Sequence, residues 1–106
     1  MNVMLEDAPK GYNFDYECHI TVEVTKGNEY MVEPFGRIYG WKSSVIEGDP
    51  DLGVGLRCFY TKHFRDIGTA KEETDTMAYL ADQEDWGKVV RKKIELVLMD
   101  TRNNTW

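Results

Sequence analysis

The stretch that decides the fold is Glu17-Cys18-His19-Ile20-Thr21-Val22-Glu23-Val24. Its apolar residues occupy every second position, and polar residues occupy the positions between them. This alternation is typical of a β-strand that packs one face on a core and exposes the other, and the β-branched residues favour the same structure. The polar face carries His19 and Thr21 between two glutamates. We therefore look for functional side chains on the sheet face opposite the core.

Four further segments have patterns that predict a strand or a helix. Residues 41–47 are expected to form a second strand, and alternation at residues 56–63 predicts a third. Thr69 followed three residues later by Glu72 predicts a capping box at the start of a helix that ends near Glu84. Beyond Gly87, alternation from Val90 to Leu98 predicts a long last strand, with Val90 on its apolar side.

Residues 29–40 allow two interpretations. Their apolar residues have helical spacing, with Pro34 acceptable in a first turn and Gly40 placed to end the helix in the left-handed conformation. The alternative is a β-hairpin, in which Tyr30 and Val32 continue a strand across the turn at residues 25–28.

With a helix there, the order of elements predicts an α+β domain of ferredoxin-like βαββαβ type. Such a domain has a four-stranded antiparallel sheet with two helices on one face. Right-handed crossovers place the first and third strands side by side at the centre. We expect this single domain at residues 16–101, with an N-terminal arm at 1–15 and a C-terminal tail at 102–106. A short strand around Tyr12 to Tyr16 within the arm is an alternative.

The composition restricts the classes of function. The chain has 106 residues, enough for one domain with a core, and a formal net charge of −6, which opposes binding to nucleic acid or anionic membranes. No apolar run approaches the roughly 20 residues that cross a bilayer, and the first residues lack the pattern of a signal peptide. The two cysteines lack CxxC spacing and are expected to be reduced, buried thiols. These features predict a cytoplasmic protein.

The predicted registers bring His19 and His63 to the same open sheet face, on neighbouring strands. The binding face expected around them and Thr21 consists of Glu17, Glu23, Arg57, Phe59, Thr61, Arg91, Lys93 and Glu95. Open, partly apolar sheet faces are often covered by a partner or a second copy. The sequence therefore predicts a small binding or accessory protein that engages a protein partner or forms a homo-oligomer.

His19-Ile20-Thr21 resembles one half of the paired H-x-T/S signature of the 2H phosphoesterase family. In that family two such motifs face each other across a cleft, and their histidines act as general base and general acid on a phosphodiester or cyclic phosphate. The resemblance implies, as an alternative function, a phosphodiesterase acting on cyclic nucleotides or RNA ends, with His19 in acid/base catalysis and Thr21 as a phosphate contact. Because Thr61-Lys62-His63 reverses the motif, either His63 or the His19 of a second subunit would complete the pair.

Other binding functions have weaker support. No H-x-H or H-E-x-x-H spacing indicates a metal site, and we expect neither metal nor cofactor. Asp49 and Asp51 beside Gly53 lack the remaining ligands of a calcium loop and are expected in a turn. Phe59 with Arg57 could form a platform for single-stranded RNA, but this strand lacks the glycines and paired aromatics of such domains.

The sequence as a whole resembles small uncharacterised α+β proteins of phages and bacteria. The resemblance rests on His19-Ile20-Thr21-Val22, on Gly40-Trp41-Lys42-Ser43-Ser44, and on Arg91-Lys92-Lys93-Ile94-Glu95. It implies an accessory protein, of the kind that phages encode, that acts on a partner macromolecule. It implies no particular activity.

Overall fold

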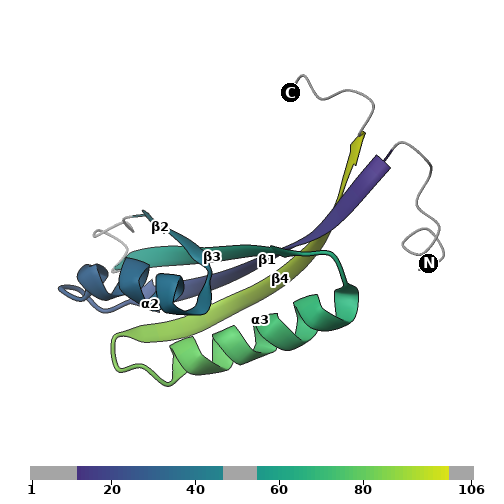
Figure 1. Ribbon diagram of the computed structural model, residues 1–106. Helices are drawn as coiled ribbons and strands as arrows, with labels where there is room; N and C mark the ends of the chain where they lie inside the picture. The colour runs from purple at the N-terminus through teal and green to yellow at the C-terminus, as the bar shows by residue number, and fades with distance from the viewer. Residues whose placement is uncertain (1–11, 47–54, 101–106) are drawn as a thin grey trace.

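A computed structural model of the protein describes residues 12–46 and 55–100 (Figure 1). It contains four strands, two α-helices and one short 3-10 helix. In chain order these are β1 (Tyr12–Val24), η1 (Glu29–Met31), α2 (Val32–Tyr39), β2 (Lys42–Ile46), β3 (Leu56–Phe64), α3 (Ile67–Asp82) and β4 (Gly87–Asp100). The predicted α+β class, with a four-stranded antiparallel sheet and two helices, is confirmed.

The sheet has the strand order β2-β3-β1-β4, which puts β1 and β3 at its centre. Both neighbours of β1 are antiparallel to it. His19 lies opposite Thr61 of β3 on one side and opposite Lys93 of β4 on the other. Because side chains alternate between the faces of a sheet, this register decides which residues of the three strands share a face.

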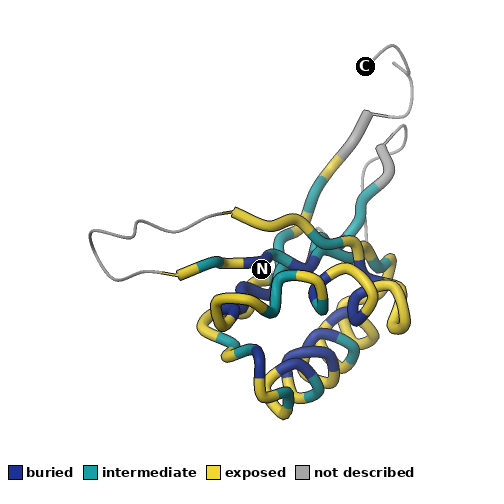
Figure 2. The backbone as a smooth tube through the Cα atoms, turned by 90° about the vertical axis from the view of Figure 1, so that its left-hand side faces the viewer, coloured by how far each residue is buried: buried dark blue, intermediate teal, exposed yellow. Residues whose placement is uncertain are grey.

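Both helices contact the same face of the sheet, and Figure 2 shows them on one side of the strands. The Tyr60 hydroxyl of β3 donates a 2.8 Å hydrogen bond to the carbonyl oxygen of Val32 in α2. The Cys18 Sγ of β1 lies 3.9 Å from the carbonyl oxygen of Ala70 in α3. The core between the layers consists of Tyr16, Cys18, Ile20, Val22, Val24, Val32, Phe35, Trp41, Cys58, Tyr60, Ala70, Met77, Ala78, Ala81 and Trp86. The opposite face of the sheet has no helix on it in the described part of the chain.

The helical interpretation of residues 29–40 is confirmed, and the hairpin alternative is wrong. The helix α2 begins at Val32, so Pro34 lies in the first turn, where its missing N–H group breaks no hydrogen bond. Gly40 ends the helix with φ of 79°, as its position in the sequence predicts. Gly36 lies against Tyr60, since a Cβ at this position would meet the Tyr60 ring at 2.7 Å.

The start of α3 differs from the prediction. Asp66 is the N-cap, and its carboxylate accepts hydrogen bonds from the Thr69 backbone N–H at 2.8 Å and from the Thr69 hydroxyl at 3.1 Å. The predicted capping box of Thr69 and Glu72 is therefore wrong, because Thr69 already lies inside the helix. The hydrogen bonds from Thr69 lower the pKa of Asp66, so the cap accepts as a carboxylate at neutral pH.

The start of β4 also corrects the sequence analysis. Thr21 pairs with Arg91 while Val22 pairs with Val89, so a β-bulge leaves Val90 outside the register. Val90 is 43% exposed, and Val89 packs against the core in its place. The prediction of Val90 on the apolar side was wrong because a bulge shifts the alternation by one residue.

The boundaries of the domain stay a prediction. The strand β1 begins at Tyr12, so residues 12–15 belong to the sheet although the sequence assigns them to the arm. Past the end of β3, where α3 begins, β1 and β4 continue as a two-stranded ribbon (Figure 1). Residues 1–11, the predicted turn with Asp49 and Asp51, and the tail at 102–106 lie outside the described residues. None of the described helices is long and apolar enough to cross a membrane.

Tyr60→Phe is expected to destabilise the domain by about 1–2 kcal/mol, because it removes a buried hydrogen bond between β3 and α2. The matched control is Tyr79→Phe, since the Tyr79 side chain is 64% exposed and its loss of a hydroxyl should change the stability by less than about 0.5 kcal/mol. Urea unfolding followed by circular dichroism measures both. Equal midpoints for the two variants would contradict the predicted role of Tyr60.

Candidate functional site on the open sheet face

The predicted site residues lie together on the sheet face opposite the helices. Each residue of β1 on this face has one neighbour on β3 and one on β4. From one end of the face to the other, the rows are His63-Glu17-Glu95, Thr61-His19-Lys93, Phe59-Thr21-Arg91 and Arg57-Glu23-Lys88, each written in the order β3, β1, β4. The structure therefore places all eleven predicted site residues on one surface, and adds Lys88 to it.

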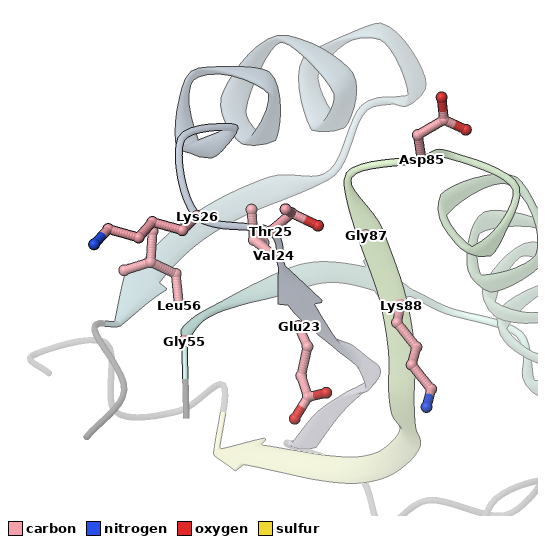
Figure 3. Close-up of a pocket in the computed structure, with 9 residues that line it drawn as sticks. All are labelled: Glu23, Val24, Thr25, Lys26, Gly55, Leu56, Asp85, Gly87 and Lys88. Carbon is pink, nitrogen blue, oxygen red and sulfur yellow. The ribbon is translucent and has the colours of Figure 1, made fainter. Parts of the chain in front are cut away.

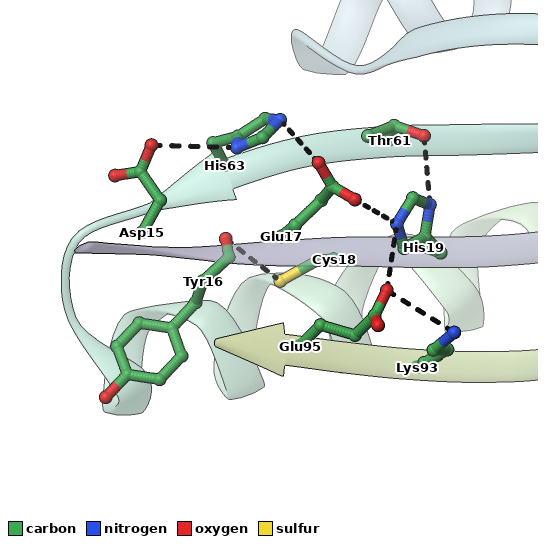
Figure 4. Close-up of polar contacts among 9 residues, drawn as sticks. All are labelled: Asp15, Tyr16, Glu17, Cys18, His19, Thr61, His63, Lys93 and Glu95. Atoms are coloured by element: carbon green, nitrogen blue, oxygen red, sulfur yellow. Dashed lines mark hydrogen bonds and ion pairs between the residues drawn. The ribbon is translucent and has the colours of Figure 1, made fainter. Parts of the chain in front are cut away.

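Both ring nitrogens of His19 have polar neighbours (Figure 4). Nε2 lies 2.7 Å from Glu17 Oε1 and 3.6 Å from Glu95 Oε1, while Nδ1 lies 3.2 Å from the Thr61 hydroxyl. The His19 side chain is 28% exposed. Contacts on both sides hold the His19 ring in one orientation.

The Glu17 carboxylate connects the two histidines (Figure 4). One oxygen contacts His19, and the other lies 3.3 Å from Nε2 of His63. His63 Nδ1 lies 3.7 Å from Asp15 Oδ2. The histidines therefore share a carboxylate between them and do not face each other across a cleft, as the two motifs of a 2H phosphoesterase do. Asp15 was missed because the sequence analysis assigned it to the arm, although it continues the odd-numbered polar positions of the strand.

A shallow hollow of about 190 Å³ lies beside His19. It is lined by His19, Thr21, Phe59, Arg91 and Lys93. Thr21 is 9% exposed although it lies on the open face, between its neighbours Phe59 and Arg91. Within the described part of the chain Arg91 forms no ion pair, so the hollow offers an aromatic ring next to an unneutralised guanidinium group.

Charge is distributed unevenly along this face. One end holds the carboxylates of Asp15, Glu17 and Glu95, with Arg65 pairing Asp15 at 3.5 Å. The other end holds the basic residues Arg57, Lys88 and Arg91, with Glu23 pairing Arg57 at 3.5 Å. We call these the acidic end and the basic end. The row of Thr61, His19 and Lys93 adds the positive charge of Lys93. Charge of opposite sign is therefore concentrated at the two ends of the face, although the protein as a whole is acidic.

A larger hollow of about 450 Å³ lies at the ends of the strands, away from both histidines (Figure 3). Its lining consists of Glu23, Val24, Thr25, Lys26, Gly55, Leu56, Asp85, Gly87 and Lys88. These residues include no histidine, cysteine or aromatic ring, and their charges are of both signs. We therefore locate the candidate site at the smaller hollow and the adjoining acidic end.

The two cysteines do not contribute a nucleophile to the site. Both are free and buried on the core side of the sheet. Burial raises the pKa of Cys18, and it raises the pKa of Cys58 to about 11. A thiol with a raised pKa stays protonated at neutral pH and reacts slowly.

No family model matches the sequence, and no curated protein is significantly similar to it. The chemistry and charge of the open face are therefore the basis for inferring a function.

The two histidines are expected to differ in reactivity toward diethyl pyrocarbonate. The His63 side chain is 48% exposed and its nitrogens have only contacts of 3.3 Å or longer, whereas His19 is held by a 2.7 Å contact and is less exposed. Mass spectrometry of the modified protein should show that His63 is modified several times faster than His19. Equal rates, or faster modification of His19, would contradict the ordered His19 ring.

Proposed function

We propose that the protein is a small binding or accessory protein that pairs with a second copy of itself through the open sheet face. The observation that carries this proposal is the polarity of the face, whose acidic end contains Asp15, Glu17 and Glu95 and whose basic end contains Arg57, Lys88 and Arg91. Complementary charges across an interface select the partner and fix its orientation.

A two-fold axis that lies between the two facing sheets and runs across the strands makes these ends complementary. In an interface of this symmetry the same patch is used by both copies, and a residue at one end of the patch contacts residues at the other end. The acidic end of one copy then faces the basic end of the other, twice. Phe59, which no helix of residues 12–46 and 55–100 covers, would be the aromatic group enclosed between the copies.

The proposal includes a ferredoxin-like plan for the domain and a cytoplasmic location. Support for the plan comes from the order of elements along the chain and from the central position of β1 and β3 in the sheet. Support for the location comes from two free, buried thiols, as is usual for proteins of a reducing compartment. A heterologous protein with the same pattern of charge is the other partner that this face would accept.

Sedimentation equilibrium at several protein concentrations tests the pairing. We expect a monomer–dimer equilibrium that Arg91→Glu weakens at least tenfold, because the new carboxylate faces the acidic end of the second copy. High salt should weaken it as well. The matched control is Lys71→Glu, which makes the same charge change at an exposed position of α3, away from the face, and should leave the equilibrium unchanged.

A charge exchange makes the test specific for the face. Glu95→Lys alone should also weaken pairing, whereas a mixture of the Arg91→Glu and Glu95→Lys proteins should form a heterodimer, since each reversed charge then meets an opposite one. A wild-type protein that stays monomeric at millimolar concentration, or a mixture that pairs no better than either variant, would contradict the proposal.

The second candidate function is a 2H-like phosphoesterase, and the basic hollow beside His19 favours it. Arg91 and Lys93 could hold a phosphate group there, with Thr21 as a further contact and a base stacked on Phe59. One acid/base group is missing, because His63 is not part of the hollow. A face-to-face pair would bring the middle rows of two copies together near the axis, and the second His19 would then supply the missing group.

Hydrolysis of 2′,3′-cyclic and 3′,5′-cyclic nucleotides and of short RNA tests this candidate. Loss of an essential acid/base group costs about a hundredfold or more in rate, so His19→Ala should lower any turnover by at least that factor. The control variant His63→Ala should keep most of it, and circular dichroism should show that both variants are folded. Absence of turnover by the wild-type protein, or equal losses in both variants, would contradict a site centred on two copies of His19.

A further inference from the structure

The acidic end of the open face contains a group of residues with the chemistry of metal ligands. Glu17, His19 and Glu95 each offer one ligand atom, and these three atoms all lie within 4.8 Å of one another (Figure 4). Glu17 and His19 are two residues apart on β1 and point to the same face, and Glu95 lies directly opposite Glu17 on β4. We propose that these three side chains bind a divalent transition-metal ion, with Zn²⁺ as the ion that fits the ligand set. This site belongs to one chain and does not depend on the pairing of two copies.

One separation between the ligand atoms already suits a tetrahedral ion, and a small movement of Glu17 adjusts a second. Two ligands bound at about 2.0–2.2 Å in tetrahedral geometry lie roughly 3.3–3.6 Å apart. His19 Nε2 and Glu95 Oε1 are 3.6 Å apart and already have this separation. His19 Nε2 and Glu17 Oε1 are 2.7 Å apart, so the Glu17 carboxylate must move by about 0.6 Å, which a change of side-chain torsion provides. The three ligands leave a fourth position for water.

Neighbouring groups orient two of the three ligands. Nδ1 of His19 lies 3.2 Å from the Thr61 hydroxyl, and donation of its N–H to that oxygen leaves the Nε2 lone pair directed at the ion. The second oxygen of Glu17 lies 3.3 Å from His63 Nε2, which leaves Oε1 as the ligating atom. Thr61 and His63 are thus positioning residues, of the kind that metal sites in proteins regularly have around their ligands.

Electrostatics favours a cation at this point. Glu17 and Glu95 are directly opposed on neighbouring strands, an arrangement of like charges that is unfavourable by itself. Lys93 Nζ lies 3.3 Å from Glu95 Oε1 and neutralises part of this charge. The Lys93 side chain is 43% exposed on a flexible stem, so it can move into water when a metal ion takes its place.

The ligand types decide which ions fit. One imidazole with two carboxylates suits Zn²⁺ and, more weakly, Mn²⁺, whereas Mg²⁺ and Ca²⁺ prefer oxygen ligands only. The sequence analysis expected no metal because it considered the spacing of ligands along one segment. Glu95 is 76 residues away from His19 in the sequence and comes beside it only through the pairing of β1 with β4.

Isothermal titration of the full-length protein with ZnCl₂, and separately with MgCl₂, tests the site. We expect one Zn²⁺ per chain and no comparable Mg²⁺ binding. His19→Ala and Glu95→Gln should each weaken Zn²⁺ binding at least tenfold, and Thr61→Val should weaken it by a smaller factor. Lys93→Met should strengthen Zn²⁺ binding several-fold, because the competing ammonium group is gone. A purely structural role of Lys93 would not produce tighter binding.

Glu23→Gln is the matched control, since it makes the same change on the same strand and face but outside the ligand group. It should bind Zn²⁺ as the wild type does, and circular dichroism should show that every variant is folded. Repeating the titration with the Arg91→Glu protein separates the metal site from pairing, because Zn²⁺ binding should persist in a monomer. Absence of Zn²⁺ binding at 1 mM, or binding by His19→Ala and Glu95→Gln that is as tight as in the wild type, would overturn the proposal. The second result would assign any bound zinc to other groups, such as His63 with Asp15.

Discussion

The register of β1 between β3 and β4 is the constraint on which the rest of the structure depends. Because side chains alternate along a strand, this one register puts Cys18, Ile20 and Val22 under the helices, and puts Glu17 and His19 on the open face. A slip of one residue would bury His19 and expose Ile20. Burial of the apolar side chains of β1 therefore determines which of its residues are exposed on the open face and can take part in binding or chemistry.

The polar side in turn explains why His19 is held so firmly. The register sets Thr61 and Lys93 on either side of it, and Glu17 and Glu95 one row away. None of these neighbours is adjacent to His19 in the sequence, yet three of them lie within 3.6 Å of its ring nitrogens. The chemistry of the face is thus a property of the sheet and of its pairing, more than of any short motif.

Much of this arrangement can be predicted from the sequence, and the exceptions have physical reasons. Strong alternation in β1 and β3 is enough to place both histidines on one face, because the core tolerates only one register. The N-cap at Asp66 was missed because Thr69 and Glu72 also match a capping pattern, and only the hydrogen bond from Thr69 N–H to Asp66 distinguishes them. Val90 was misplaced because a bulge adds a residue that alternation cannot reveal. A group of metal ligands that combines residues of β1 and β4 likewise cannot be found from motif spacing, because spacing rules consider one segment at a time.

The two proposals for this face are coupled through charge. The proposed pairing of two copies would use the negative charge of Glu17 and Glu95, and the proposed Zn²⁺ site would neutralise those same carboxylates. A metal ion would then weaken the attraction of the acidic end for Arg91 of the second copy, unless the second copy supplies the fourth ligand. Such linkage is reciprocal: whatever Zn²⁺ does to the pairing equilibrium, pairing must do to the affinity for Zn²⁺. The sign of that linkage therefore reports whether the metal site opens toward solvent or toward the partner.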